Sequence, residues 1–208
     1  CIIVQLLVNY PQEIRFMDLS IYNEAEKFVF DSFNKIGKSS RIPHFERTVH
    51  WIKKLKPDAD EVLLVAAVAH DIERAFPHKD DSKMVNSVKS TGTEYYRPHE
   101  EQGAEIIADF LRQQNVDAHF IERVKMLVSR HEEGGNDDQN LLKDADSVSF
   151  FETYVSIFIN EKAKLDGKEM VKQQFDETFD RITSEQAKQI ARPLYEAAIK
   201  ALTSSPEI

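Results

Sequence analysis

Apolar residues recur along most of the chain at steps of three and four positions, the spacing that places them on one face of an α-helix. Strand-like alternation bounded by hairpin turn pairs is absent, and the 208 residues include only six glycines. The pattern therefore predicts an all-α protein. The predicted helices cover residues 21–36, 43–55, 60–74, 99–114, 118–131, 140–161, 168–181 and 184–203.

Local signals mark where several of these helices begin. Pro43 suits the first turn of the second helix, and an aspartate from the break Pro57-Asp58-Ala59-Asp60 caps the third. Asp117 is in the position of another cap, and Thr183 or Ser184 opens the last helix. These residues satisfy backbone groups that a helix end leaves unpaired, so they support the assigned boundaries.

The predicted helix over residues 60–74 is apolar on almost every side, which is typical of a helix buried at the centre of a bundle. The polar residues 75–98 follow it as a connector containing prolines, a glycine and paired aspartates. Connectors of this length are uncommon in compact domains and often serve as lids or binding segments.

We expect a single helical domain over residues 21–208. Its functional core would lie at about 40–150, and residues from about 160 to 208 would pack as a helical cap. Residues 1–20 are predicted to be an N-terminal extension, non-native or poorly ordered. The apolar first eight residues are too short to span a bilayer and lack the basic start and cleavage site of a signal peptide. A lipid-modified Cys1 is the alternative interpretation of this start.

Composition narrows the choice of partners. The net charge of −9 argues against a protein that tracks a nucleic-acid polymer by electrostatic attraction. No segment is long and apolar enough to predict a membrane span. The single cysteine excludes an intramolecular disulfide and fits a reducing compartment, so we expect a cytoplasmic protein. The sequence does not indicate an oligomeric state.

The most informative segment is Ala69-His70-Asp71-Ile72, at the end of the apolar run Val62–Ala69. A polar pair is costly in such surroundings unless it is compensated, and imidazole and carboxylate are both metal-ligand groups. A histidine with satisfied hydrogen bonds in the core, beside an aspartate at a helix end, would explain this pair alone.

Further candidate ligands lie at other predicted helix ends and on the helix over 140–161. Each has an ordinary explanation by itself: a capping or surface residue for His44 and His99, and a favourable helix C-terminus for His131. Asp146 occupies an apolar helical position and needs a partner, whereas a solvated face would explain Asp144. Side chains from several helix ends can converge on one point, so together these residues favour a metal site.

The order of these residues resembles that of the HD-domain superfamily of metal-dependent phosphohydrolases, which have an all-α fold. Three segments carry the resemblance over residues 40–150: His44-x-x-Arg47-x-Val49, Ala69-His70-Asp71-Ile72 and Asp144-Ala145-Asp146-Ser147. They are similar to the family's first-histidine helix, its His-Asp pair and its closing aspartate, with Asp146 in the ligand position.

Two more segments, His99–Ile106 and Val128–Glu132, resemble the additional histidine segments of binuclear members. The resemblance implies one or two divalent ions of Mn, Mg, Fe, Co or Ni. Asp71 would bridge two ions; the ligands completing one site would be His44, His70 and Asp146, and those completing the other would be His99 and His131.

The chain also departs from its relatives. Gly134-Gly135-Asn136 stands where cyclic-dinucleotide phosphodiesterases carry Gly-Tyr-Pro, so that substrate is not transferred. Glu73 either corresponds to the catalytic glutamate of some nucleotidase members or pairs with a nearby base on a solvated face. The candidates for binding substrate phosphate are basic residues expected at the rim, Arg74, Lys79, Arg97 and Arg130. His50, His78 and His119 are predicted not to be ligands.

The resemblance implies metal-assisted hydrolysis of a nucleotide or another small phosphorylated metabolite, with Asp71 as both ligand and orienter of the attacking water and Glu73 as a second catalytic residue. Two alternatives stay open. A di-iron oxygenase of the same fold would use a very similar ligand set, and a non-catalytic nucleotide-sensing module would bind without turnover. Metal analysis distinguishes the first alternative, and a turnover assay distinguishes the second.

Overall fold

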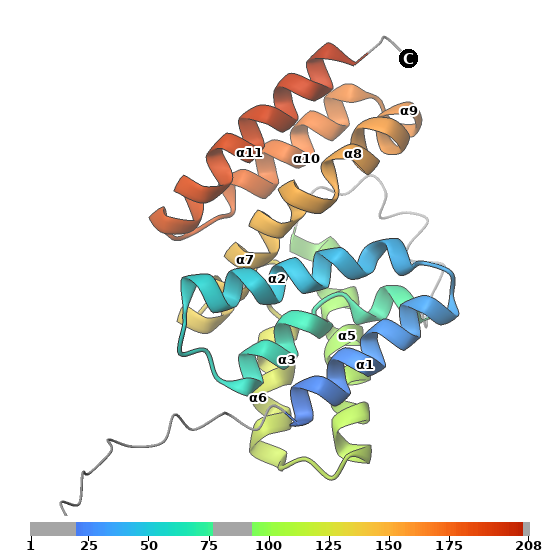
Figure 1. Ribbon diagram of the computed structural model, residues 1–208, viewed down its shortest axis with the longest axis vertical. Coiled ribbons are helices and arrows are strands. Elements are labelled where there is room, and N and C mark those ends of the chain that lie inside the picture. Colours follow the sequence, from blue (N-terminus) through green and yellow to red (C-terminus); the bar gives the residue numbers. More distant parts are fainter. Residues whose placement is uncertain (1–19, 77–92, 206–208) are drawn as a thin grey trace, which may run out of the picture.

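The computed structural model describes residues 20–76 and 93–205, and within these ranges every regular element is a helix (Figure 1). The predicted all-α fold class is therefore confirmed. The α-helices are α1 (Ser20–Lys35), α2 (Ile42–Leu55), α3 (Glu61–Ala69), α5 (Thr93–Gln113), α6 (Ala118–Val128), α7 (Asp137–Thr153), α8 (Val155–Ile157), α9 (Ala163–Asp166), α10 (Lys168–Asp180) and α11 (Glu185–Ser204). The shorter elements are η1 (Ser39–Arg41), η2 (Ile72–Ala75) and the π-helical turn η3 (Phe158–Lys162).

Helix α3 is the centre of the larger hydrophobic core, as its composition predicts. All eight residues from Val62 to Ala69 are buried, and α3 packs against α1, α2, α6 and α7. A second core forms where α10 and α11 pack on each other and on the C-terminal half of α7. Helix α7 thus belongs to both cores, and α8–α11 lie beyond it in Figure 1.

The helix-start signals are confirmed by hydrogen bonds. Asp60 accepts from the Leu63 amide at 3.0 Å, and Asp117 accepts from the His119 amide at 2.9 Å. Of the two candidates for the last helix, Ser184 is the N-cap, because its hydroxyl accepts from the Ala187 amide at 3.2 Å. These side chains satisfy amides that no residue inside the helix can reach.

Three predicted boundaries are wrong by five residues or more. The helix over 60–74 ends at Ala69, because the chain tightens into the i→i+3 bonding of η2, with the Arg74 amide on the Asp71 carbonyl at 3.2 Å. Helix α5 begins at Thr93 rather than His99, so it contains Pro98, which the sequence analysis placed in the connector. The helix predicted over 140–161 ends at Thr153 and gives way to shorter turns that reach Asp166.

The expectations for the N-terminal extension fall on residues 1–19, outside the described residues, as do His78 and Lys79 of the connector. In the described ranges, no helix combines the length and the apolar character that a membrane span needs.

Candidate metal centre

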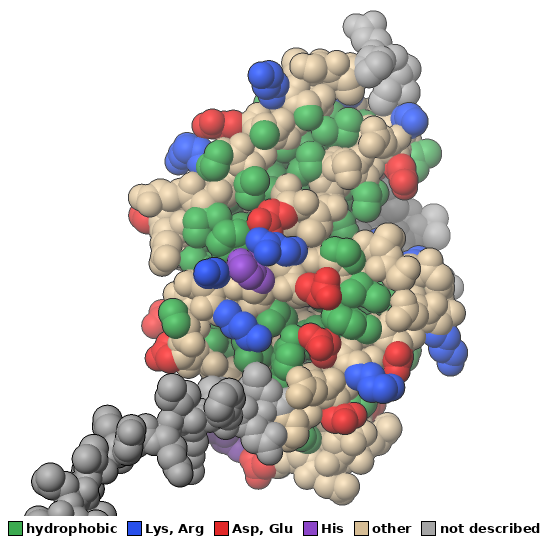
Figure 2. All heavy atoms as spheres, in the orientation of Figure 1, with side chains coloured by type: hydrophobic (Ala, Val, Ile, Leu, Met, Phe, Trp, Pro, Cys, Tyr) green, Lys and Arg blue, Asp and Glu red, His purple; other side chains and the backbone are tan. Residues whose placement is uncertain are grey.

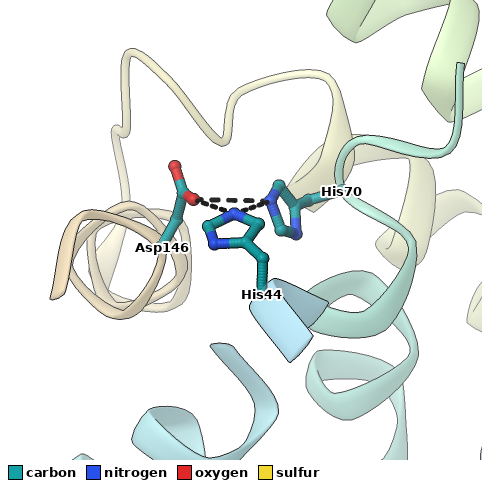
Figure 3. Close-up of side chains that lie close together, drawn as sticks. All are labelled: His44, His70 and Asp146. Carbon is teal, nitrogen blue, oxygen red and sulfur yellow. Dashed lines mark hydrogen bonds and ion pairs between the residues drawn. The ribbon is translucent and has the colours of Figure 1, made fainter. Parts of the chain in front are cut away.

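Two groups of metal-ligand side chains meet inside the larger core. The first group combines His44 from α2, His70 directly after α3, and Asp146 from α7, all buried (Figure 3). His44 Nε2 lies 3.2 Å from His70 Nε2 and 3.0 Å from Asp146 Oδ1, and His70 Nε2 lies 3.4 Å from the same oxygen. Three donor atoms from three separate helices therefore face one point.

The second group combines Asp71, His99 from α5, and His131 from the turn after α6. His131 Nε2 lies 3.7 Å from Asp71 Oδ1, and the rings of His99 and His131 are 5.7 Å apart. Because the rings of His70 and His131 are only 5.1 Å apart, the two groups adjoin. The structure thus brings together the six side chains that the sequence predicts as ligands.

The outer ring nitrogens fix how the histidines are protonated. His70 Nδ1 donates to the Ala67 carbonyl at 2.9 Å, and His131 Nδ1 donates to the Val128 carbonyl at 2.8 Å. Carbonyl oxygens only accept, so each Nδ1 carries a proton and a neutral ring leaves a lone pair on Nε2. That lone pair points at the neighbouring ligand atoms, as a metal-binding histidine requires.

His44 is held in the same state by two hydroxyl groups from α7. Its Nδ1 lies 2.9 Å from Ser149 Oγ and 3.2 Å from Thr153 Oγ1. Both hydroxyls donate to backbone carbonyls, Ser149 to Asp146 at 3.1 Å and Thr153 to Ser149 at 2.7 Å. Their oxygens therefore accept from His44 Nδ1, and Nε2 again keeps the lone pair.

These donor sets fit divalent cations. In the first group, two imidazole lone pairs and a carboxylate oxygen lie within 3.4 Å of one another, an arrangement of acceptors that only a proton or a cation can bring together favourably. In the second, the buried atoms Asp71 Oδ1 and His131 Nε2 have no hydrogen-bond partner among the described residues. Histidine nitrogen and carboxylate oxygen are ligands that several divalent transition metals accept.

The charge states of three ligands, His44, Asp146 and Asp71, also suit metal binding, whereas for His131 burial lowers the pKa but the Asp71 carboxylate raises it above its usual value. Burial lowers the pKa of His44, which keeps the ring neutral. Burial alone would raise the pKa of Asp146, but His70 and His44 hold it below its usual value. In the same way, burial opposes ionisation of Asp71, while Arg74 and His131 hold its pKa well below the usual range. Metal ions bind the deprotonated forms, so these shifts favour ion binding near neutral pH.

Asp71 presents its two oxygens to different neighbours. Oδ1 faces His131, whereas Oδ2 forms an ion pair with Arg74 Nε at 2.6 Å. Arg74 thus lies directly beside the centre, and its side chain is 38% exposed, as expected for a residue at the rim.

Glu73 is buried next to this pair, with its side chain only 1% exposed. The solvated face considered from the sequence is therefore wrong. Burial, together with the nearby Asp71 carboxylate, raises the pKa of Glu73 to about 7. Gly103 of α5 lies against this carboxyl group: a Cβ there would stand 3.4 Å from Glu73 Oε2 and 3.5 Å from the His70 carbonyl oxygen.

Of the other predicted phosphate-binding residues, Arg130 alone has a side chain within the described part of the chain. Arg130 is exposed and pairs with Glu133 at 3.1 Å. Lys79 lies outside the described residues, and so does the side chain of Arg97. His50 and His119 belong to neither ligand group, in agreement with the prediction.

The sequence analysis missed Arg181, which follows α10 and reaches the centre from the second core. Its Nη2 donates to Asp146 Oδ2 at 2.6 Å, its Nε donates to Ser147 Oγ at 2.8 Å, and it forms an ion pair with Glu132. An arginine at a helix end, 35 positions from its partner, carries no motif that could have revealed this contact.

Asp144 binds the turn between α10 and α11, which also contains Arg181. Its carboxylate accepts from the amides of Thr183 at 2.7 Å and Ser184 at 2.8 Å, and the residue is 1% exposed. The solvated face suggested for Asp144 is therefore wrong, because the turn between α10 and α11 covers it.

A solved structure of another protein has a similar fold. A crystal structure of a predicted HD superfamily hydrolase from an uncultured Thermotogales bacterium superimposes with a TM-score of 0.52 and 18% identity, over 87% of this chain and 88% of that one. The structural match shows that the two proteins share a fold, and the buried His/Asp groups contain the six residues on which the resemblance found in the sequence rests. No curated protein matches the chain. The model of the domain of unknown function DUF4202 matches residues 31–202, and the chain belongs to this family.

Proposed function

We propose that this chain is a metal-dependent phosphohydrolase that acts on a nucleotide or another small phosphorylated metabolite. The observation that carries the proposal is the pair of adjoining ligand groups, in which six side chains from five separate segments of the chain come together. His44, His70 and Asp146 would hold one ion, and Asp71, His99 and His131 a second. The bridging role of Asp71 stays a prediction.

Divalent ions in these positions would lower the pKa of a coordinated water from about 15.7 towards about 7 and would neutralise charge on a phosphoryl group. The protein's own residues supply the rest. Asp71 orients the attacking water, and Arg74 beside it offers guanidinium nitrogens to a phosphoryl oxygen. Glu73, with a pKa of about 7, can hold or release a proton near neutral pH next to the reacting group.

A small substrate fits the surface better than a polymer. Acidic and basic side chains are interspersed over the face shown in Figure 2, and the net charge is −9. Nucleic-acid polymers are bound by surfaces with clustered positive charge. We therefore propose a small phosphorylated substrate, with no nucleic-acid polymer and no membrane as partner, and a cytoplasmic location.

The test is a phosphatase screen of protein purified without chelator, with added Mn, Mg, Co, Ni or Fe. We expect turnover of phosphate esters that depends on the ion. Asp71→Ala removes a ligand and the group that orients water, so turnover should fall to background, while His119→Ala, at an exposed position, should retain wild-type activity. Iron content with oxygen-dependent turnover would instead favour the oxygenase, and nucleotide binding without turnover under any metal would favour the sensing module.

A further inference from the structure

Arg41 and Tyr154 lie beside the candidate centre but belong to neither ligand group. Arg41 immediately precedes α2 and stands three positions before His44, and Tyr154 immediately follows α7. The ring of Tyr154 stacks on the ring of His44, with centroids 4.4 Å apart and planes inclined by 28°. The guanidinium carbon of Arg41 lies 5.8 Å from the centre of the Tyr154 ring. Tyr154 thus lies directly against the first ligand group, and Arg41 lies over Tyr154.

The Tyr154 hydroxyl has an unused hydrogen-bonding capacity. The residue is only 8% exposed, and its hydroxyl has no hydrogen-bond partner among the described residues. Buried tyrosine hydroxyls nearly always find a partner, and one that lacks it asks for a missing ligand.

Two guanidinium groups lie on this side of the candidate centre: Arg41 lies over the Tyr154 ring, and Arg74 pairs with the ligand Asp71. Burial and the Asp71 carboxylate raise the pKa of Tyr154, while Arg41 and Arg74 act in the opposite direction. Arg41 forms no ion pair with any described residue. Arg74 pairs with Asp71 and Glu73, with its Nε 2.6 Å from Asp71 Oδ2 and 3.5 Å from Glu73 Oε1.

We propose that Arg41, Tyr154 and Arg74 form an oxyanion site that receives the phosphoryl group of a phosphate monoester; this site rests on the proposed function. Two cations and a hydroxyl donor match a group with three terminal oxygens and nearly two negative charges at neutral pH. A phosphate diester has only two terminal oxygens and one charge, so it leaves part of the donor set unused. The planar guanidinium suits this task because it can donate two parallel hydrogen bonds.

The first test is direct binding of inorganic phosphate, measured by isothermal titration calorimetry on metal-loaded and metal-free protein. Tyr154→Phe keeps the ring on His44 and removes one hydroxyl, and Arg41→Gln removes one cation. Loss of a charge-assisted hydrogen bond corresponds to about a 10- to 100-fold weaker affinity, which we expect for Arg41→Gln, with a smaller loss for Tyr154→Phe. Arg41→Lys should recover part of the loss. Lys38→Gln, at an exposed position near Arg41, is the matched control for net charge and should leave phosphate affinity unchanged.

The second readout is turnover of p-nitrophenyl phosphate and bis(p-nitrophenyl) phosphate. Arg41→Gln should raise KM for the monoester by about tenfold or more, with a smaller change in kcat and little change for the diester. Phosphate affinity equal to wild type in both Arg41→Gln and Tyr154→Phe would overturn the oxyanion site, even if the wild type hydrolyses phosphate esters. Phosphate binding that depends on Arg41 in a protein without turnover would instead support the site and contradict the proposed function. Thermal melting shows whether each variant is folded, and if Arg41→Gln is not, Tyr154→Phe carries the test.

Discussion

At the scale of single residues, the orientation of each histidine depends on a partner of its outer nitrogen. The outer nitrogens of His70 and His131 donate to backbone carbonyls. The outer nitrogen of His44 instead contacts a side-chain hydroxyl, that of Ser149, which a substitution can remove. Ser149 also contacts Thr48 at 2.7 Å, so its hydroxyl is fixed on two sides. Groups of this kind hold a ligand in the right protonation state and usually tune metal affinity.

Removing this hydroxyl should weaken metal binding without unfolding the protein. We expect Ser149→Ala to lower divalent-ion affinity by about tenfold, because His44 Nδ1 keeps only the longer contact to Thr153. A competition titration with a chromogenic chelator measures the change. Ser32→Ala, which removes a comparable hydroxyl from α1, is the control. An unchanged affinity in Ser149→Ala would show that His44 does not need this partner.

Glu100 makes the stability of the metal-free protein depend on pH. It is fully buried, and burial raises its pKa to about 7, although His131 acts in the opposite direction. A folded-state pKa above the unfolded value means that the native state binds the proton more tightly. The stabilising contribution of the protonated Glu100 is therefore fully present below about pH 4.5, and it is lost as the pH rises through the folded-state pKa of about 7.

Glu100→Gln should remove this dependence, because the amide oxygen can still accept from the Glu132 backbone amide. Between pH 5 and 8 the metal-free variant should gain stability over wild type, by up to about 3 kcal/mol at pH 8. Urea unfolding across this range measures the difference, and Glu122→Gln, at an exposed position, is the control. Parallel pH profiles for wild type and Glu100→Gln would contradict the assignment.

The six ligands could be predicted because their residue types and order form a recognisable pattern on helix ends. Arg181, Ser149 and the buried state of Asp144 could not, because each depends on how α7 packs against a distant segment. The sequence equally well allowed Glu73 and Asp144 to face solvent, and only the packing of neighbouring helices decides that they are buried.

At the scale of helices, three starts could be predicted from their capping residues. Asp60, Asp117 and Ser184 bind the first amides of their helices, and this chemistry is visible in the sequence. The end of α3 at Ala69 and the end of α7 at Thr153 have no comparable signal.

The turn between α10 and α11 is attached to α7 through Asp144. Asp144→Ala would leave two backbone amides without their acceptor, which should cost about 2 kcal/mol of unfolding free energy. Because Arg181 belongs to the same turn, metal affinity should fall as well. Urea unfolding and the chelator titration measure the two effects. The control Asp137→Ala changes an exposed residue of the same helix, and equal losses in both variants would argue against the role of this turn.

At the scale of the whole molecule, the candidate centre joins both hydrophobic cores. Its ligands come from the larger core, whereas Arg181 arrives from the second core and pairs with the ligand Asp146. Helix α7 connects the two, since it carries the ligand Asp146 and packs against α2 and α3 as well as against α11 (Figure 1). Metal binding should therefore stabilise the entire described fold, because a ligand that binds only the native state shifts unfolding by mass action.

The most direct test of the central claim is elemental analysis of protein purified without chelator, for wild type, His70→Ala, His131→Ala and His119→Ala. If the two ligand groups hold divalent ions, wild type and His119→Ala should carry the same metal content. His70→Ala and His131→Ala should each lose most of the ion held by their own group. Wild-type metal content in both His70→Ala and His131→Ala, confirmed as folded by circular dichroism, would contradict the account.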